Sequence, residues 1–174
     1  MASGQGHKNE VLVLGIDPGS RCTGYGLIRE TSGRAELVDV GTIRPPKEGA
    51  LDVRLGRIFS RLAEIIAAHC PDEAAIEDVF AAKNAASALK LGQARGAAIA
   101  ACAYSGVPVS AYAPTKIKQS LVGAGRAEKG QVAFMVGRVL GVKPDWPSDA
   151  ADALACAITH LNERRVRRLM ERTG

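Results

Sequence analysis

Short apolar runs separated by turn residues occupy the first part of the chain and predict strands. Val11–Ile16 is apolar throughout, which is typical of a strand buried on both faces. Thr23–Ile28 and Ala35–Ile43 follow after short gaps, and Ser32-Gly33 has the composition of a tight hairpin turn. Three strands with such short connections predict an antiparallel start to a sheet.

The spacing of apolar residues then becomes helical. Residues 51–68 place apolar side chains on one face of an amphipathic helix, which Pro71 ends. Ala74–Glu77 predicts a further short strand, and Pro108–Ala113 predicts another, parallel to it because a helix intervenes. The rest of the chain predicts three helices, over Pro114–Leu121, Glu128–Leu140 and Asp149 to about Arg168.

The helix between these two strands, at about residues 84–104, has an unusual composition. It is rich in alanine and glycine and apolar nearly all round, so we expect it to be buried on more than one side. Gly92, Gly96 and Ala100 recur every four residues and form a flat face. That face can pack against the sheet of its own chain or against a second copy of the chain, and the sequence leaves both open.

Composition restricts the class of protein. The 174 residues fit one domain, or one domain with tails. Residues 1–10 are polar and are expected to be a disordered extension, and the absence of a signal peptide or a long apolar span predicts a cytoplasmic protein without a membrane partner. The four cysteines lack the paired spacing of metal sites.

Basic residues give the chain a net charge of +5 and gather in two places. Lys116, Lys118, Arg126 and Lys129 lie close together, and residues 161–174 form a basic C-terminal tail. Either cluster fits a phosphate-binding surface or an ordinary solvated face, since position matters more than total charge.

Acidic residues end two of the predicted strands. Asp17 follows Val11–Ile16 at a Pro-Gly turn, and Glu77 ends a later strand. Each alone fits a turn or a polar flank as well as a ligand-binding loop. Asp149 and Asp152 share a face in the first turn of the last helix, where acids also suit the helix dipole. Two acids on one face repel each other, and a bound cation relieves that repulsion.

These four carboxylates can converge at one end of a mixed α/β sheet. A set of carboxylates without Cys or His ligands is typical of a site for Mg²⁺ or Mn²⁺. Two such ions about 3.5–4 Å apart activate water and stabilise the leaving oxygen in phosphodiester hydrolysis. His160 lies about 12 Å along the helix from Asp152, too far to share the metal, so we interpret it as structural or peripheral.

Four segments resemble the RuvC family of Holliday junction resolvases: GIDPGSRCTGYG, AIEDVFAAKNAASALKLGQARG, GAGRAEKGQV and SDAADALACAITH. They keep their order over about Val11 to His160. The resemblance implies a ribonuclease H-like nuclease domain over residues 11–160, with a five-stranded mixed sheet flanked by helices. It implies a homodimer that resolves four-way DNA junctions by paired symmetrical nicks in recombination and repair. The implied cofactor is Mg²⁺, replaceable by Mn²⁺, with two ions per site, and the implied partner is the RuvA–RuvB branch-migration complex.

The same resemblance implies roles for individual residues. The catalytic, metal-binding acids would be Asp17, Glu77, Asp149 and Asp152. Lys118 and Lys129 match basic residues near the scissile phosphates. Phe80 matches an aromatic that stacks on junction bases, although a core position is the ordinary alternative for phenylalanine. The further expected DNA contacts are Lys83, Arg95, Lys116 and Arg126.

One residue departs from the family pattern. Asp78 stands where many relatives have glutamine, and we hypothesise that its charge beside Glu77 alters metal preference.

Two other functions compete with the resemblance. An actin-like or sugar-kinase-type phosphotransferase shares the strand–Asp–Gly–turn–strand opening but needs a second domain, for which 174 residues leave no room. A non-catalytic junction-binding dimer would gain nothing from acids grouped at its DNA face.

Overall fold

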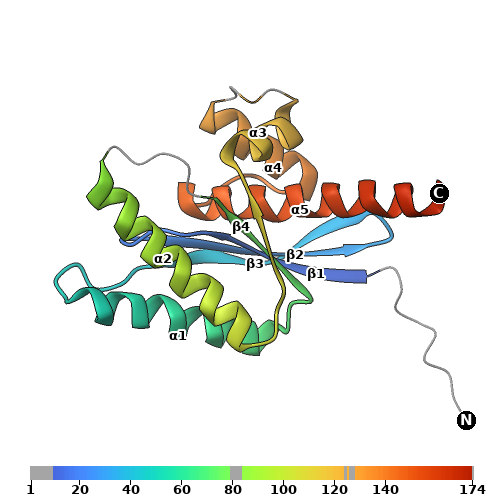
Figure 1. Cartoon of the computed structure of the whole chain (residues 1–174). Helices are drawn as coiled ribbons and strands as arrows, with labels where there is room; N and C mark the ends of the chain where they lie inside the picture. Colours follow the sequence, from blue (N-terminus) through green and yellow to red (C-terminus); the bar gives the residue numbers. More distant parts are fainter. Residues whose placement is uncertain (1–9, 79–83, 124, 126–127, 174) are drawn as a thin grey trace, which may run out of the picture.

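The computed structural model describes residues 10–78, 84–123, 125 and 128–173. The chain forms a five-stranded sheet with helices on both faces (Figure 1). The elements in chain order are β1 (Glu10–Asp17), β2 (Thr23–Thr31), β3 (Arg34–Ile43), α1 (Leu51–His69), β4 (Glu73–Glu77), α2 (Ala85–Tyr104), β5 (Val109–Tyr112), α3 (Pro114–Val122), α4 (Lys129–Leu140) and α5 (Ser148–Thr173). The strand order is β3-β2-β1-β4-β5. The pairs β1–β2 and β2–β3 are antiparallel, and β1–β4 and β4–β5 are parallel, which confirms the predicted mixed sheet.

The predicted hairpin turn between β2 and β3 is confirmed by its backbone angles. Ser32 and Gly33 have φ values of 52° and 87°, in the left-handed region that glycine adopts at no steric cost. This turn lies at the opposite end of the sheet from Asp17, because Asp17 pairs with Gly24 at the start of β2.

Helix α5 is longer than the sequence pattern predicts. It continues past Arg168 to Thr173, so the basic segment from residue 161 to residue 173 is helical. Two arginines hold it against the sheet, since Arg164 pairs with Glu73 and Arg165 Nε donates to Glu30 Oε2 at 2.8 Å. In this part of α5, ion pairs to distant strands stabilise the helix in place of the apolar contacts from which the sequence pattern predicts one.

The sheet separates two apolar cores. Val11 and Val13 of β1 pack on the side of α3, α4 and α5, whereas Leu12, Leu14 and Ile16 pack on the side of α1 and α2. This alternation follows from the two-residue period of a strand, and it explains why Val11–Ile16 is apolar throughout.

Helix α2 buries one face, not several. Its buried residues are Ala94, Ala98, Ala101 and Cys102. Gly92, Gly96 and Ala100 are exposed, so the flat face does not pack on the sheet of its own chain. The expectation of burial on more than one side is therefore wrong for a single copy of the chain, because α2 packs beside α1 on one face of the sheet and leaves its other sides exposed (Figure 1).

Candidate active site

Strand geometry directs Asp17 and Glu77 toward α5. Asp17 ends the row of β1 side chains that begins with Val11 and Val13, which face α5. Glu77 ends the corresponding row of β4, after Ala75, in the same core. The register pairs Ile16 with Ile76, so the two carboxylates lie on adjacent parallel strands at the same end of the sheet.

Glycines in β1 and β2 let the start of α5 lie directly on these strands. A Cβ at Gly15 would lie 2.0 Å from the carbonyl oxygen of Ala153, and one at Gly24 would lie 1.8 Å from that of Asp149. No other residue fits at either position without moving the helix. The close approach places the start of α5, which carries Asp149 and Asp152, against the end of β1 and the start of β2.

The four acids influence one another electrostatically. Burial raises the pKa of Asp17 to about 8, from an ordinary value of 3.8, and the carboxylates of Glu77, Asp152 and Asp149 add to the increase. A hydrogen bond between the Asp17 and Glu77 side chains acts in the same direction. The sequence prediction that these residues come together is consistent with this interaction.

The donor chemistry of the cluster fits a hard divalent cation. All four candidate ligands are carboxylates, and a cation removes the repulsion that raises the pKa of Asp17. Within residues 10–78, 84–123 and 128–173, no group of three or more His, Cys, Asp or Glu side chains has the geometry of a formed metal centre.

The loop after Asp17 is fixed by three hydrogen bonds. Thr23 Oγ1 donates to the Gly19 carbonyl at 2.9 Å and accepts from Gly19 N at 3.2 Å. Arg54 Nη2 donates to the Ser20 carbonyl. Asp17-Pro18-Gly19 therefore forms both a structural turn and a rigid support for a carboxylate.

The expected DNA contacts have different surroundings. Lys118 is half-buried on α3, and Lys116 Nζ lies 2.7 Å from Glu163 Oε1. Arg95 Nη2 lies 3.0 Å from Asp78 Oδ1, so the charge of Asp78 is balanced by an arginine rather than added to the acidic cluster. Lys129 begins α4. The other three residues lie outside the described residues: Phe80, Lys83 and Arg126.

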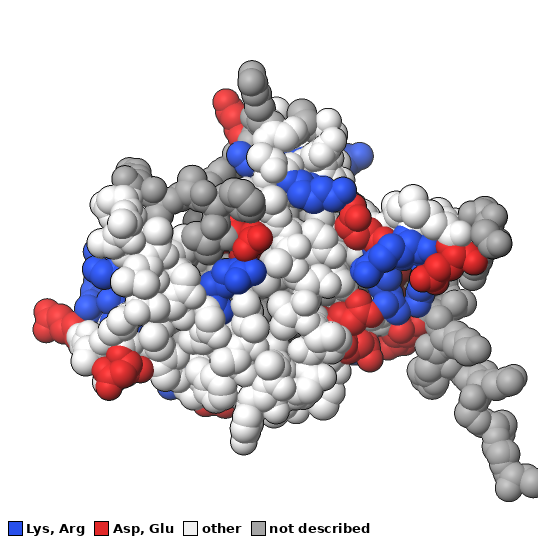
Figure 2. Space-filling view, in the orientation of Figure 1, with Lys and Arg blue, Asp and Glu red and all other residues white. Residues whose placement is uncertain are grey.

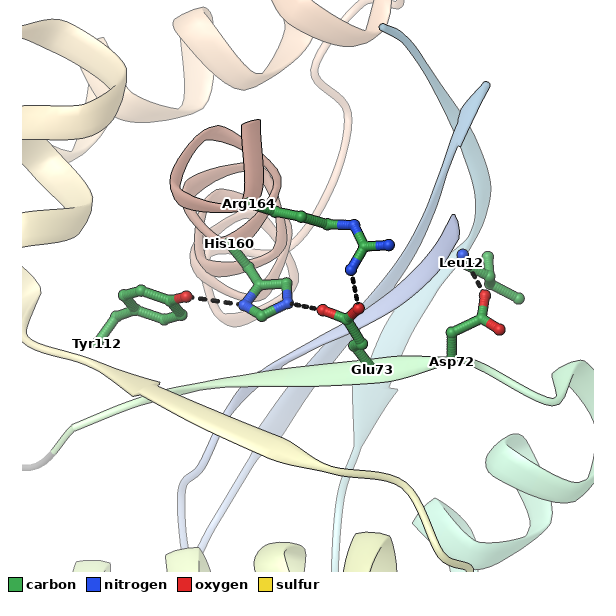
Figure 3. A network of polar contacts seen from close by, with 6 residues as sticks. All are labelled: Leu12, Asp72, Glu73, Tyr112, His160 and Arg164. Atoms are coloured by element: carbon green, nitrogen blue, oxygen red, sulfur yellow. Dashed lines mark hydrogen bonds and ion pairs between the residues drawn. The ribbon is translucent and has the colours of Figure 1, made fainter. Parts of the chain in front are cut away.

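The interpretation of His160 as structural is confirmed. It is 2% exposed, its Nδ1 lies 2.7 Å from the Tyr112 hydroxyl, and its Nε2 lies 2.5 Å from Glu73 Oε2 (Figure 3). Arg164 reaches the other oxygen of Glu73. The sequence analysis missed Glu73, although its position four residues before Glu77 places both on one face of β4.

Comparison with known proteins identifies the family. The family model described as crossover junction endodeoxyribonuclease RuvC matches residues 13–160. The chain belongs to the RuvC family of crossover junction endodeoxyribonucleases. The family resemblance, the enzyme class of phosphodiester-hydrolysing nuclease and the functional assignment to recombination and repair are confirmed.

Relatives match over nearly the whole chain. Crossover junction endodeoxyribonuclease RuvC of Oleidesulfovibrio alaskensis is 64% identical over 159 residues, 91% of this chain and 95% of the relative. The protein of the same name from Nitratidesulfovibrio vulgaris strain Hildenborough is 62% identical over 159 residues, with the same coverage of 91% and 95%. A solved structure of Thermus thermophilus RuvC in complex with a Holliday junction substrate is 37% identical, with a TM-score of 0.85, and covers 90% of this chain and 96% of that one.

These matches confirm the ribonuclease H-like fold and exclude the phosphotransferase. Nucleases of this family depend on metal ions. A membrane-spanning helix is absent from the part of the chain that the structure describes, since none of its helices is both long and apolar enough.

Proposed function

We propose that this chain resolves four-way DNA junctions by paired symmetrical nicks, with the acids at the Asp17 end of the sheet as its catalytic centre. The observation that carries the proposal is geometric: Asp17 and Glu77 end adjacent parallel strands at the same end of the sheet, and the start of α5 with Asp149 lies directly against that end. The pKa of Asp17, which burial and neighbouring carboxylates raise to about 8, agrees with it. Perturbed carboxylates held together on rigid elements are typical of functional sites.

Four residues would hold the metal: Asp17, Glu77, Asp149 and Asp152. Their oxygen-only donors favour Mg²⁺, with Mn²⁺ as a substitute, and two ions would balance their combined negative charge. When bound, such ions supply an activated water and stabilise the leaving oxygen of the phosphodiester. The chain contributes a fixed position for each carboxylate, from two strand ends and one helix turn.

Basic residues of α3 and α4 would hold the DNA beside these acids. Helices α3 and α4 lie next to α5 on the same face of the sheet (Figure 1). Lys118 on α3 and Lys129 at the start of α4 would neutralise phosphates near the cut. The remaining proposed DNA contacts are Phe80, Lys83, Arg95, Lys116 and Arg126.

The exposed face of α2 would form a homodimer. Figure 2 shows mostly uncharged atoms over α2 and the neighbouring part of α1. Leu89 is 63% exposed and Tyr104 is 81% exposed, on either side of Gly92 and Gly96. A second copy would cover this apolar face, and two active sites related by symmetry would cut two strands of one junction. We further propose that this dimer works with the RuvA–RuvB complex in the cytoplasm, as the family resemblance implies.

Cleavage of a labelled four-way junction tests the function. The junction and a linear duplex of the same sequence are incubated with the protein, without divalent cations and with Mg²⁺ or Mn²⁺. We expect paired symmetrical nicks on the junction alone, and only with metal. Junction binding without nicks in either metal would support the non-catalytic junction-binding dimer instead.

A further inference from the structure

A basic cleft lies beside the catalytic end of the sheet, directly after the edge strand β3, whereas α3 follows β5 at the opposite edge. It has a volume of about 630 Å³ and is formed by the loop after Asp17, the segment after β3 and the start of α1. Its charged lining residues are Arg21, Arg44, Lys47 and Arg54, and none of the lining residues is acidic. The cleft at the other end of α5 differs, because Asp72, Glu73 and Glu171 line it together with its arginines.

The register of the sheet sets the distance from this cleft to the catalytic acids. Ile43 at the end of β3 pairs with Thr23, and Asp17 pairs with the next residue, Gly24. Arg44, directly after β3, is therefore two strands away from Asp17, about 10 Å at the usual strand spacing. That distance corresponds to about three nucleotides at a rise of 3.4 Å each.

Cys22 connects the cleft to the acidic cluster. It lines the cleft, and its thiol lies beside Asp149. One half-buried side chain thus adjoins a candidate metal ligand and a cationic wall of the cleft.

The positive charges of the cleft are available to a ligand. Arg21, Arg44 and Lys47 are exposed, and within the described ranges none of them forms an ion pair. Arg54 is half-buried, donates through Nη2 to the Ser20 carbonyl, and has a buried Nε without a hydrogen-bond partner among the described residues. Arg54 therefore fixes the catalytic loop and closes the base of the cleft, while the exposed residues face outward.

We propose that this cleft binds the phosphodiester backbone of the cleaved DNA strand, on the opposite side of the cut from Lys118. The proposal rests on the junction-cleaving function proposed above. Guanidinium groups bind phosphate oxygens through paired hydrogen bonds, and a lysine adds a mobile point charge. A strand held on both sides of the acids is prevented from sliding across them during the reaction.

Strand β3 offers a matched pair of variants for the test. Arg44→Gln removes one charge directly after β3, in the cleft, whereas Arg34→Gln removes one charge at the first residue of β3, at the far end of the sheet. Junction affinity is measured over a series of salt concentrations in the absence of divalent cations. We expect Arg44→Gln to lower the slope of log affinity against log salt by about one, and Arg34→Gln to leave it unchanged.

Uncharged phosphates then locate the contact. Junctions carrying a single methylphosphonate at successive positions beside the cut are compared with the unmodified junction. At one position within about three nucleotides of the cut, we expect the modification to weaken binding of the wild-type protein. The same modification should leave binding of the Arg44→Gln variant almost unchanged, because the substitution and the methylphosphonate each remove the same contact.

The outcomes separate this inference from the proposed function. If the wild-type protein does not cleave the junction, both the proposed function and the role of the cleft are overturned. Normal cleavage with equal salt slopes for Arg44→Gln and Arg34→Gln would overturn the cleft alone. Inorganic pyrophosphate serves as the probe for a free anion. Two results together would contradict a backbone ligand. Pyrophosphate, at constant ionic strength, would displace the junction from the wild-type protein but not from Arg44→Gln, and no methylphosphonate would change junction binding.

Discussion

Strand β4 carries a glutamate at each end, and α5 meets the two residues in opposite ways. At one end, Glu73 contacts the cation Arg164 and the imidazole of His160, which in turn contacts Tyr112 (Figure 3). At the other end, Glu77 lies with acids, and the pKa of Asp17 is raised to about 8 by burial and by its neighbours. The Glu73 end joins an acid to a cation and an imidazole, whereas the other end brings carboxylates together.

The helix dipole compensates only part of the charge at the acidic end. The N-terminus of α5, which carries Asp149, has a partial positive charge of about half an elementary unit. The grouped carboxylates carry more negative charge than this, even when the proton that Asp17 retains up to about pH 8 is counted. Glu73 therefore makes contacts that stabilise the fold. The grouped acids cost stability and, under the proposed function, serve catalysis.

The largest expected effect comes from removing a charge at the acidic end. Asp17→Asn should lower junction cleavage by at least about a hundredfold, because even the outer partners of metal ligands contribute 10- to 100-fold. Junction binding should stay equal or become tighter, since repulsion of phosphates decreases. Single-turnover cleavage and a gel-shift titration measure both quantities. A parallel loss of binding and cleavage would show that Asp17 is a structural residue.

The two glutamates of β4 test the comparison directly. Glu77→Gln should abolish cleavage and leave the free energy of unfolding equal or higher. Glu73→Gln should lower the free energy of unfolding by about 2 kcal/mol, the usual size of hydrogen bonds to charged groups, and leave cleavage by the folded protein intact. Urea denaturation and junction cleavage are measured for both variants. Identical profiles for the two would contradict the division of roles.

The close contact of α5 with the sheet predicts an effect of added volume. Gly15→Ala should lower the free energy of unfolding by about 1–3 kcal/mol, because its Cβ would meet the Ala153 carbonyl oxygen. Gly56→Ala on α1 is the control, since a Cβ there meets nothing within 4 Å. In a helix this control should be neutral or stabilising. Equal effects of the two in urea denaturation would mean that α5 does not rest on β1.

The raised pKa of Asp17 predicts a dependence of stability on pH. The folded state binds this proton more tightly than the unfolded state, in which the pKa is near 3.8. Its contribution to stability is therefore complete below about pH 4 and is lost as the pH rises through about 8. Without divalent cations, Asp17→Asn should exceed the wild type in stability by an amount that grows from about pH 5 to pH 8. A constant difference in urea denaturation over that range would contradict this.

The smallest expected effect concerns DNA contacts outside the acidic cluster. Lys118→Ala should weaken cleavage and lower the salt slope of junction binding by about one, as expected for the loss of one phosphate contact. Lys116→Ala should have less effect, because Lys116 is already paired with Glu163. Salt titrations of junction binding compare the two. An unchanged slope and rate for Lys118→Ala would exclude it from the site.

The sequence predicts the acidic end better than the balanced end for a physical reason. Asp17 and Glu77 end apolar runs, and Asp149 and Asp152 share one helix turn, so local patterns expose them. The partners of Glu73 are 87 and 91 residues away and meet it only through the packing of α5 on β4. Long-range ion pairs of this kind also extend α5 beyond the end that its apolar pattern predicts. The surroundings of Arg44 depend similarly on strand register.

Binding of Mn²⁺ to the full-length protein tests the central claim most directly. Isothermal titration compares the wild type with Glu77→Gln and Glu73→Gln, at a pH where all three are folded. We expect the wild type and Glu73→Gln to bind Mn²⁺ alike and Glu77→Gln to bind at least about tenfold more weakly. Weaker binding by Glu73→Gln than by Glu77→Gln would place the metal at the wrong end of β4 and contradict the account.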